Sequence, residues 1–475
     1  MFEHIKNIPL KFRFQSKFLL ILTYLSLLVM VIIFIKEFPD VMKIWNSGLA
    51  GFFDVENNTA INNFEDLLRN SYLIKQRLFY LIGAVASSIF FFACYRLHKL
   101  IFAGHNAWAE STVFSLCFVI LISVLAYFTT FFVHNDDMDI IIDNKKDLDI
   151  FLADRRKVSV TNKEMPPVFI PTGVFMQSIE FTSSYNCIVT FMIWQRYNVR
   201  DTADYSIGFE LPEAQEADVE EAYRKYNADS TVLTVGWNVK ATIREIFNFR
   251  LYPFDHQNLW VRFWHKDFDK NVILVPDIKS YPQYNPFKKV GLEEDMVLPG
   301  WSVKGSYFGY RKNSYSTNFG IDSYIGAENF PELYFNVFVQ RDFMSVFFSD
   351  LTPVLMVVVL LFITIYVSHD ETTETDFFKF SVMDVAGIVG TLIFVVILAQ
   401  IDLRSNLSTD TVLYIEYYYF IIYFLLFLVM VNYILFQKKG LDWHLIEYRD
   451  NYIPKVLFFP ILTFSIFMVT IILFF

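Results

Sequence analysis

The sequence predicts a membrane protein in which an antiparallel β-sandwich lies between two groups of membrane-spanning helices. Three observations support this fold class. The 475-residue chain is 54% hydrophobic and only 19% charged, whereas a soluble domain usually carries about a quarter charged residues. Seven stretches are long and apolar enough to span a bilayer, which takes roughly 20 residues of helix. The segment between them is polar and alternates with the two-residue period of β-strands.

The apolar stretches fall into two groups, three before residue 134 and four after residue 342. They are Phe18–Ile35, Leu78–Cys94, Val113–Val133, Phe343–Val367, Ser381–Gln400, Thr411–Phe436 and Ile453–Phe475. The chain therefore divides into an all-α region with three transmembrane helices (1–133), a β-sandwich (134–342) and a four-helix transmembrane region (343–475). The first stretch follows a basic leader and could instead be a cleaved signal peptide. Lys36 follows it directly and no small-residue cleavage site is adjacent, so we expect a retained helix.

Orientation follows from the basic residues that flank the spans, because Lys and Arg concentrate on the cytoplasmic side. Such residues precede the first span, follow the second and separate the last two; they are Lys6, Lys11, Arg13, Lys17, Arg96, Lys99, Lys438, Lys439, Arg449 and Lys455. This pattern predicts a multi-pass protein of the inner (cell) membrane with a cytoplasmic N-terminus and an extracellular or periplasmic sandwich. The loop His369–Lys379 departs from the pattern, because it is acidic although it is expected inside.

Within 134–342, apolar and polar residues alternate in Asn186–Tyr197, in Pro331–Arg341 and, less regularly, in Gln257–Trp264. Turn signals such as Pro166-Pro167 and Pro299-Gly300 separate these stretches. Many short strands with such breaks are typical of an antiparallel sandwich. The charged stretch Glu213–Tyr226 shows no alternation, so we expect a short helix or a long loop there.

Composition excludes several classes of function. The net charge is −10 and no strongly basic block exists, so nucleic acid is not an expected partner. Three cysteines, two of them in apolar stretches, do not make a disulfide framework. The eight His residues have no metal-like spacing and no Ser/His/Asp arrangement stands out, so we expect neither an enzyme nor a cofactor. The acids of Glu213–Glu221 and Glu293–Asp295 could bind modulatory calcium, but solvated surface is the favoured interpretation and no metal ligand is assigned.

The segment Leu251–Asn258 contains Tyr252-Pro253-Phe254-Asp255-His256-Gln257, which resembles the signature of pentameric ligand-gated ion channels, the Cys-loop receptor superfamily. The order of parts agrees with that family: strands come first, Arg341 stands at the border, and Pro353 lies in the first of four spans. Leu298–Trp301 also resembles the family's strand before its agonist-binding region. The resemblance covers roughly residues 160–475 and is to prokaryotic members, because Glu245 and Leu259 stand where the bounding cysteines would be. The three leading spans are not part of it.

The resemblance implies a homopentameric, ligand-gated ion channel in a lipid membrane, opened by a small-molecule agonist at the outer subunit interface and conducting inorganic cations. It assigns coupling between sandwich and pore to Asp255 and Pro253 at the sandwich base, to Arg341, and to Arg404 in the outer loop Arg404–Thr411. These residues could equally hold the two domains together. The alternative function is a non-conducting membrane sensor whose sandwich binds a ligand.

The second channel span carries a stripe at steps of four and three residues, which place its members on one helix face. They are Asp384, Ile388, Thr391, Val395, Leu398 and Asp402. In a five-fold bundle this face would line a pore, with acidic rings at both mouths that attract cations. Alternatively, the apolar members pack in a core. A shifted register would use Gly387, Phe394 or Ala399 instead.

The family binds agonists in aromatic boxes between sandwiches, and ring faces attract cations. The resemblance places the following residues there: Trp194, Arg196, Trp264, Tyr281, Tyr310, Tyr315 and Phe319. The last three are expected in a loop before the final strand. Packing is the alternative for each of them, because 19% of the chain is aromatic.

Overall fold

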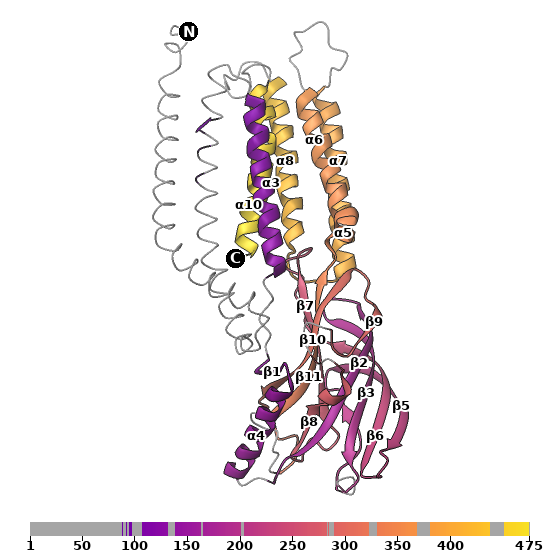
Figure 1. Cartoon of the computed structure of the whole chain (residues 1–475). Coiled ribbons are helices and arrows are strands. Elements are labelled where there is room, and N and C mark those ends of the chain that lie inside the picture. The colour runs from indigo at the N-terminus through magenta and orange to yellow at the C-terminus, as the bar shows by residue number, and fades with distance from the viewer. Residues whose placement is uncertain are drawn as a thin grey trace. The chain divides into compact units, whose positions relative to one another are not determined.

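The computed structural model describes residues 107–131, 138–162, 165–200, 204–282, 284, 289–322, 330–367, 381–437 and 451–474, together with Ser88, Phe92, Tyr95 and Arg96. The chain forms two compact units (Figure 1). The helical unit comprises Met1–His134, Val346–Leu403 and Val412–Phe475, and the sheet unit comprises Asn135–Ser345 and Arg404–Thr411. The expected span Phe18–Ile35, nearly all of Leu78–Cys94 and the whole loop His369–Lys379 lie outside the described residues.

Five helices among the described residues are long and apolar enough to cross a membrane, which indicates a multi-pass membrane protein. Four of them are α3 (Ala107–Phe131), α7 (Val382–Leu407), α8 (Tyr414–Gln437) and α10 (Tyr452–Phe474). The fifth, Phe343–Val367, is a continuous run of α5 (Phe343–Val346), a π-helix (Phe347–Leu351) and α6 (Thr352–Val367). They correspond to five of the seven expected apolar stretches. The π-helix lies directly before Pro353, whose ring nitrogen donates no hydrogen bond, so the ladder is rearranged there.

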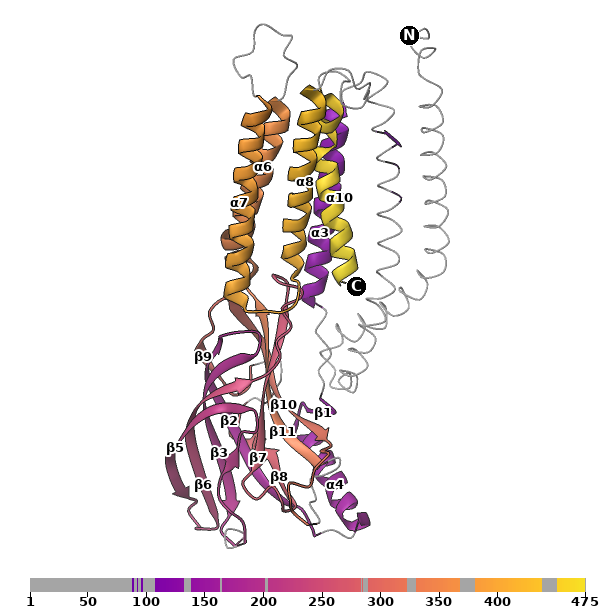
Figure 2. The ribbon, with the colours of Figure 1, turned by 180° about the vertical axis from the view of Figure 1, so that it is seen from behind.

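Helix α10 packs against α3 and α8 in the helical unit, and Figure 2 shows the three helices side by side. A proline and a serine explain part of this packing. Pro460 lies inside α10 and has no N–H to donate to the carbonyl of Val456, four residues earlier. The hydroxyl of Ser111 on α3 donates to that same carbonyl at 2.6 Å. The leading helix α3 therefore supplies the hydrogen bond that α10 cannot make for itself.

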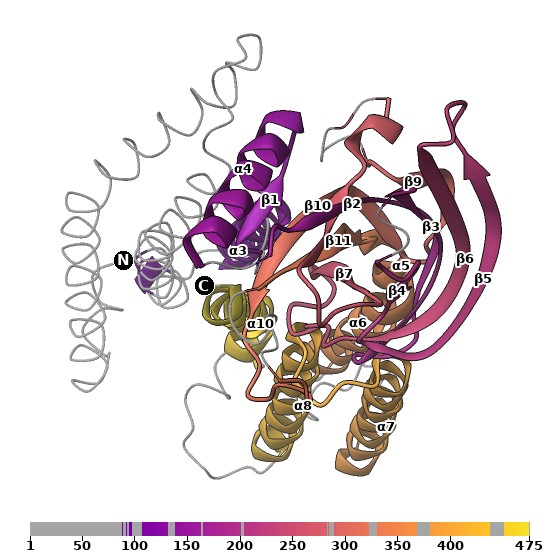
Figure 3. The same cartoon turned by 90° about the horizontal axis from the view of Figure 1, so that it is seen from below.

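The sheet unit contains two sheets that form separate layers (Figure 3). The five-stranded sheet has the order β1 (Ile140–Ile142), β10 (Trp301–Asn313), β11 (Phe330–Arg341), β7 (His256–His265) and β4 (Phe209–Glu210). The six-stranded sheet has the order β5 (Ala214–Tyr226), β6 (Val232–Arg244), β3 (Asn186–Asn198), β2 (Val168–Phe181) and β8 (Val272–Pro276), and β9 (Leu292–Val297) pairs with β2. The alternating stretches at Asn186–Tyr197, Gln257–Trp264 and Pro331–Arg341 are therefore confirmed as strands.

The core lies between the sheets and follows the predicted alternation. On β3, Cys187, Val189, Phe191 and Ile193 are fully buried while the residues between them are half-buried. The ring of Phe191 meets that of Phe263 on β7 edge to face, with centroids 6.0 Å apart. Contacts of this kind join the two layers.

Two expectations about this region were wrong, and one helix was not predicted. The stretch Glu213–Tyr226 is neither a helix nor a loop, because Ala214–Tyr226 forms the edge strand β5. Nearly all of its residues are exposed, so both of its faces tolerate charge and no alternation appears in the sequence. The sandwich is also not wholly antiparallel, because β8 and β9 run parallel to β2. Helix α4 (Lys145–Asn162) was not expected; it buries Phe151, which stacks on Tyr310 with ring centroids 4.0 Å apart.

We expect Ser111→Ala to weaken the packing of α3 on α10 by about 1 kcal/mol, the usual size of an interhelical hydrogen bond in a membrane. In a Pro460→Ala background the same change should cost less, because the alanine backbone N–H can donate to Val456 within the helix. Thermal unfolding of the detergent-solubilised chain, run as a double-mutant cycle, measures both effects. Ser123→Ala is the control, since among the described residues Ser123 bonds to the Val119 carbonyl of its own helix and not to α10. Equal costs in the two backgrounds would contradict this account of Pro460.

Candidate functional site

The end of β11 carries a buried ion pair. Arg341 donates from Nε to Oδ1 of Asp255 at 2.7 Å and from Nη2 to Oδ2 at 3.0 Å. The side chains are 10% and 1% exposed. This two-point geometry is the strongest form of a carboxylate–guanidinium contact. The structure thus places these two residues, both named from the sequence, in direct contact.

Three aromatic rings surround the Arg341 guanidinium. Its central carbon lies 4.0 Å from the ring centroid of Trp301, 4.6 Å from that of Tyr252 and 5.2 Å from that of Phe249. Ring faces attract a cation, so the cage adds to the attraction of the carboxylate. Pro253 is buried in the same turn, next to Tyr252, and follows a cis peptide bond.

A second polar contact fixes the carboxylate. Gln257 donates from Nε2 to Oδ2 of Asp255 at 3.2 Å and to the carbonyl of Asn248 at 2.9 Å. The backbone N–H of Asn248 donates back to Oε1 of Gln257 at 3.1 Å. Through Gln257, the position of Asp255 is set relative to the segment that enters β7.

The loop that follows α7 belongs to the same unit and bonds to the turn between β2 and β3. The Ser184 hydroxyl donates to the Ser408 carbonyl at 2.7 Å, and the Tyr185 hydroxyl donates to Oδ2 of Asp410 at 2.6 Å. The bond to Asp410 raises the pKa of Tyr185. Arg404 was expected in this loop but lies in the last turn of α7, which continues to Leu407.

Helix α7 keeps the predicted stripe away from its own packing face. Its buried residues are Val385, Val389, Leu392, Val396 and Leu403. In the stripe, Ile388 is half-buried and the other members are exposed: Asp384, Thr391, Val395, Leu398 and Asp402. At roughly 100° per residue, the stripe lies about 100° around the helix from the buried face. Gly387 and Phe394, which a shifted register would use, are exposed as well.

Asp384 also caps the start of the helix. Its carboxylate accepts hydrogen bonds from the backbone N–H and the hydroxyl of Ser381, both at 2.8 Å. The backbone N–H of Asp384 donates to the same hydroxyl at 3.2 Å. This is a capping box with Asp in place of the usual Glu or Gln. The sequence signal was the spacing Ser381-x-x-Asp384, which our interpretation of the stripe did not use.

A second acid lies inside the helical unit. Glu416 is fully buried near the start of α8 and accepts from the backbone N–H of Leu413 at 2.9 Å and from Nε2 of Gln400 at 3.3 Å. The side-chain oxygen Oε1 of Gln400 in turn accepts a hydrogen bond from the Tyr423 hydroxyl at 3.1 Å. Acids within apolar spans are costly unless they are partnered. Gln400 of α7 supplies that partner, a role that sequence reasoning did not assign to it.

The residues predicted to bind a ligand form two separate groups. The first contains Trp194, Arg196 and Tyr281. Trp194 Nε1 and Arg196 Nε both donate to Oδ2 of Asp277, at 2.9 and 3.0 Å, and the ring of Tyr281 lies 5.8 Å from that of Trp194. Asp277 is 4% exposed, so these contacts satisfy a buried carboxylate. The indole N–H of Trp194 and the Nε of Arg196 are thereby already engaged within the unit.

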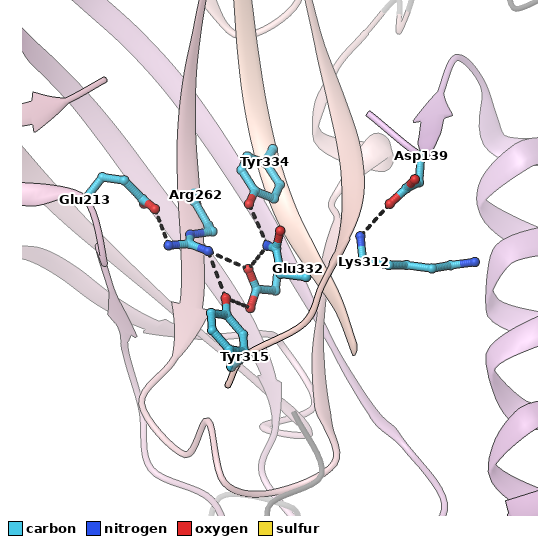
Figure 4. A network of polar contacts seen from close by, with 8 residues as sticks. Asp139, Glu213, Arg262, Lys312, Tyr315, Glu332 and Tyr334 are labelled. Carbon is cyan, nitrogen blue, oxygen red and sulfur yellow. Dashed lines mark hydrogen bonds and ion pairs between the residues drawn. The ribbon is translucent and has the colours of Figure 1, made fainter. Parts of the chain in front are cut away.

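The second group contains Trp264, Tyr315 and Phe319, joined by Phe268. Ring centroids of Trp264 lie 5.5 to 6.1 Å from those of the other three. Beside them Arg262 pairs with two carboxylates, Glu213 and Glu332, in the network of Figure 4. The Tyr315 hydroxyl donates to Glu332 Oε1 at 2.5 Å and accepts from Arg262 Nη1 at 2.9 Å.

Tyr310 belongs to neither group. It lies within β10 rather than in a loop, is fully buried, and donates from its hydroxyl to the Leu274 carbonyl at 3.0 Å. Its neighbours are core residues, so Tyr310 packs in the core, which is the alternative given for it in the sequence analysis. Tyr315 and Phe319 do follow β10, as expected.

The acidic clusters of the sequence, Glu213–Glu221 and Glu293–Asp295, consist of acids that are either in ion pairs or exposed. Glu213 pairs with Arg262, and Glu293, Glu294 and Asp295 are exposed on β9. Within the described ranges, no three His, Cys, Asp or Glu side chains are placed to hold a metal ion. Glu245, at the position of an expected family cysteine, is 9% exposed and accepts from the Trp260 N–H at 3.3 Å. Burial raises the pKa of its carboxyl to about 9.

No protein-family model matches the chain, and a search of curated proteins finds no match either. Function is therefore inferred from the geometry above and from the resemblance carried by 252–257 and its surroundings.

We expect Arg341→Ala to lower the free energy of unfolding by about 3–5 kcal/mol, because Asp255 would remain buried without its partner. Asp255→Ala should cost a similar amount, and the double variant should cost less than the sum. Thermal unfolding of the solubilised chain measures the cycle. Arg224→Ala is the matched control: its bidentate pair with Glu221 is 44% and 42% exposed, so it should cost far less than Arg341→Ala. Additive losses would show that the two buried charges are independent.

Proposed function

We propose that this chain is the subunit of a homopentameric, ligand-gated ion channel that conducts cations. The observation that carries the proposal is the arrangement of α7. The helix buries one apolar face and leaves a neighbouring face exposed that carries two acids and a hydroxyl. Acids that face lipid are costly, whereas the same acids facing a water-filled axis are not.

The spacing of the acids fits the two mouths of a pore. Asp384 and Asp402 are 18 residues apart, which is about 27 Å along a helix. The hydrocarbon core of a bilayer is about 30 Å thick. Five copies would place one carboxylate ring near each side, and such rings concentrate cations and repel anions. Val395 and Leu398 between them supply an apolar constriction that closes by excluding water.

The contacts at the end of the sheet unit support gating. The loop after α7 bonds through Ser408 and Asp410 to Ser184 and Tyr185. Arg341 and Asp255 hold the end of β11, which is followed by α5. A ligand that shifts the β2–β3 turn would therefore act on the end of α7. We propose Asp255, Arg341 and this loop as the coupling elements, together with Arg404 in the last turn of α7.

Assembly is the first prediction to test. Native mass spectrometry of the detergent-extracted protein should give about 280 kDa before bound lipid, which is five copies of the 56.0 kDa chain. This measurement needs no agonist. A monomer or dimer that persists under milder extraction would contradict the channel and favour a non-conducting membrane sensor.

Charge selectivity tests α7 directly. We expect Asp384→Asn to reduce the preference for sodium over chloride, because it removes the carboxylate ring but keeps the side-chain shape. Reversal potentials in a sodium chloride gradient measure this. A Val395→Ser background should supply current without an agonist, since a hydroxyl at the apolar constriction favours wetting.

The control is Ser381→Ala, which removes the hydroxyl of the capping box but leaves the Asp384 charge. It should leave the reversal potential unchanged. If Asp384→Asn and Ser381→Ala behave alike, Asp384 acts only as a helix cap.

A further inference from the structure

Gln400 of α7 makes hydrogen bonds with two residues of α8 at once. Its Nε2 donates to Oε1 of Glu416 at 3.3 Å, and its Oε1 accepts from the Tyr423 hydroxyl at 3.1 Å. Glu416 and Tyr423 are seven residues apart, so they lie on one face of α8, two turns from each other. One amide side chain therefore ties α7 to α8 at two heights, and we call these three residues the Gln400 clamp.

Glu416 is also held from its own helix. Its Oε2 accepts a hydrogen bond from the backbone N–H of Leu413 at 2.9 Å, and α8 begins at the next residue, Tyr414. This is the half of a capping box that a Glu or Gln at the third helical position supplies. Glu416 is fully buried. One carboxylate oxygen thus caps α8 and the other receives Gln400, so the side chain has little freedom to follow α7 if that helix turns.

Gln400 interrupts the apolar face with which α7 packs. The buried residues of α7 recur in steps of four, three, four and seven, and Gln400 divides the last step into four and three; they are Val385, Val389, Leu392, Val396 and Leu403. Gln400 is half-buried and lies about 160° around the helix from Leu398 and Asp402 of the predicted stripe. Its side chain therefore does not line the proposed pore.

Hydrogen bonds and apolar contacts restrain the rotation of α7 differently. Apolar burial is non-directional, and lipid tails are as apolar as the residues of this helix, so a small turn of α7 about its axis costs little on the apolar face. A hydrogen bond weakens steeply when donor and acceptor lose their alignment. The two bonds of Gln400 therefore discriminate between rotations that the apolar residues tolerate alike.

We propose that Gln400 is a positioning residue that fixes the rotation of α7, and thereby the direction in which Asp384 and Asp402 point. It acts through Glu416 and Tyr423 and touches no ion. Its consequence for conduction rests on the proposed function: release of the clamp would turn the apolar constriction and shift the balance between open and closed pores. The rotation itself is a property of one helical unit.

Three variants distinguish this role from simple packing. Gln400→Leu keeps the approximate size of the side chain and removes both hydrogen bonds. Gln400→Glu places a second carboxylate beside Glu416, and like charges at this distance repel. The exchanged pair, Gln400→Glu with Glu416→Gln, restores each bond. The new amide donates to the new carboxylate and accepts from the N–H of Leu413, and the Tyr423 hydroxyl donates to the new carboxylate.

Spin labels on Phe394→Cys or Val395→Cys measure the rotation in the full chain in lipid vesicles, with the three native cysteines replaced by alanine. The two positions lie about 100° apart on α7. Collision rates with oxygen in lipid and with a nickel complex in water report the direction of each label. Loss of two interhelical hydrogen bonds allows a shift of roughly tenfold between rotational states. The ratio of the two labels' collision rates should change at least about threefold in Gln400→Leu and Gln400→Glu, and the exchanged pair should restore it.

Thr470→Val is the matched control. It removes a buried hydroxyl of α10 that bonds to the Tyr414 hydroxyl of α8 at 2.7 Å, so it weakens the same unit through a contact that does not involve α7. The ratio should stay unchanged in this variant. A ratio that ignores Gln400→Leu, that responds equally to Thr470→Val, or that the exchanged pair fails to restore would overturn the proposal. If Gln400→Glu does not fold, Gln400→Leu and its control decide alone.

These outcomes are separable from the proposed function, because oxygen collisions report the rotation even if the stripe faces lipid. A response to Gln400→Leu in a chain whose Val395 label meets oxygen but not nickel would keep the clamp and overturn the channel. A pentamer whose ratio ignores Gln400→Leu would do the reverse.

Discussion

The sheet unit depends on one interaction, the buried pair of Arg341 with Asp255. β11 lies between β10 and β7, and Arg341 is its last residue. The carboxylate comes from the turn before β7, and Trp301 of the surrounding rings begins β10. Three adjacent strands thus meet at one guanidinium. Removing such a charge from water is costly and is offset only when the geometry is complete, so the pair stabilises one arrangement of these segments rather than a range of them.

Other polar contacts gather at the same end of the unit. The backbone of Glu245 and Phe247 donates to the carbonyls of Tyr185 and Ser184, and the side chains of those two residues reach the loop Arg404–Thr411. Asn248, three residues after Glu245, is bonded to Gln257 and through it to Asp255. Hydrogen bonds and the short backbone segment 245–248 therefore connect the loop after α7 with the end of β11. This series is the physical basis for the proposed coupling.

Sequence reasoning succeeded where one dominant physical signal was present. Apolar length located α3, α6, α7, α8 and α10, and alternation located β3, β7 and β11. It failed at β5 because an edge strand with both faces in water needs no alternation. Sequence reasoning also placed Trp194 and Arg196 in one site with Trp264 and Tyr315, although they belong to two separate groups. A linear sequence does not show which aromatic residues are neighbours in space.

The hydrogen bond from Ser111 to Val456 has a consequence for any attempt to recombine this chain with others. A helix with an internal proline has one backbone carbonyl without its usual intrahelical hydrogen bond, and the hydrocarbon of a bilayer has no donor for it. α10 therefore cannot be transferred to another helical bundle by itself, because the Val456 carbonyl would then lack its hydrogen bond from Ser111. α3 and α10 lie at opposite ends of the described chain yet form a single exchangeable part. A chimaera made at their junctions should transfer both helices or neither.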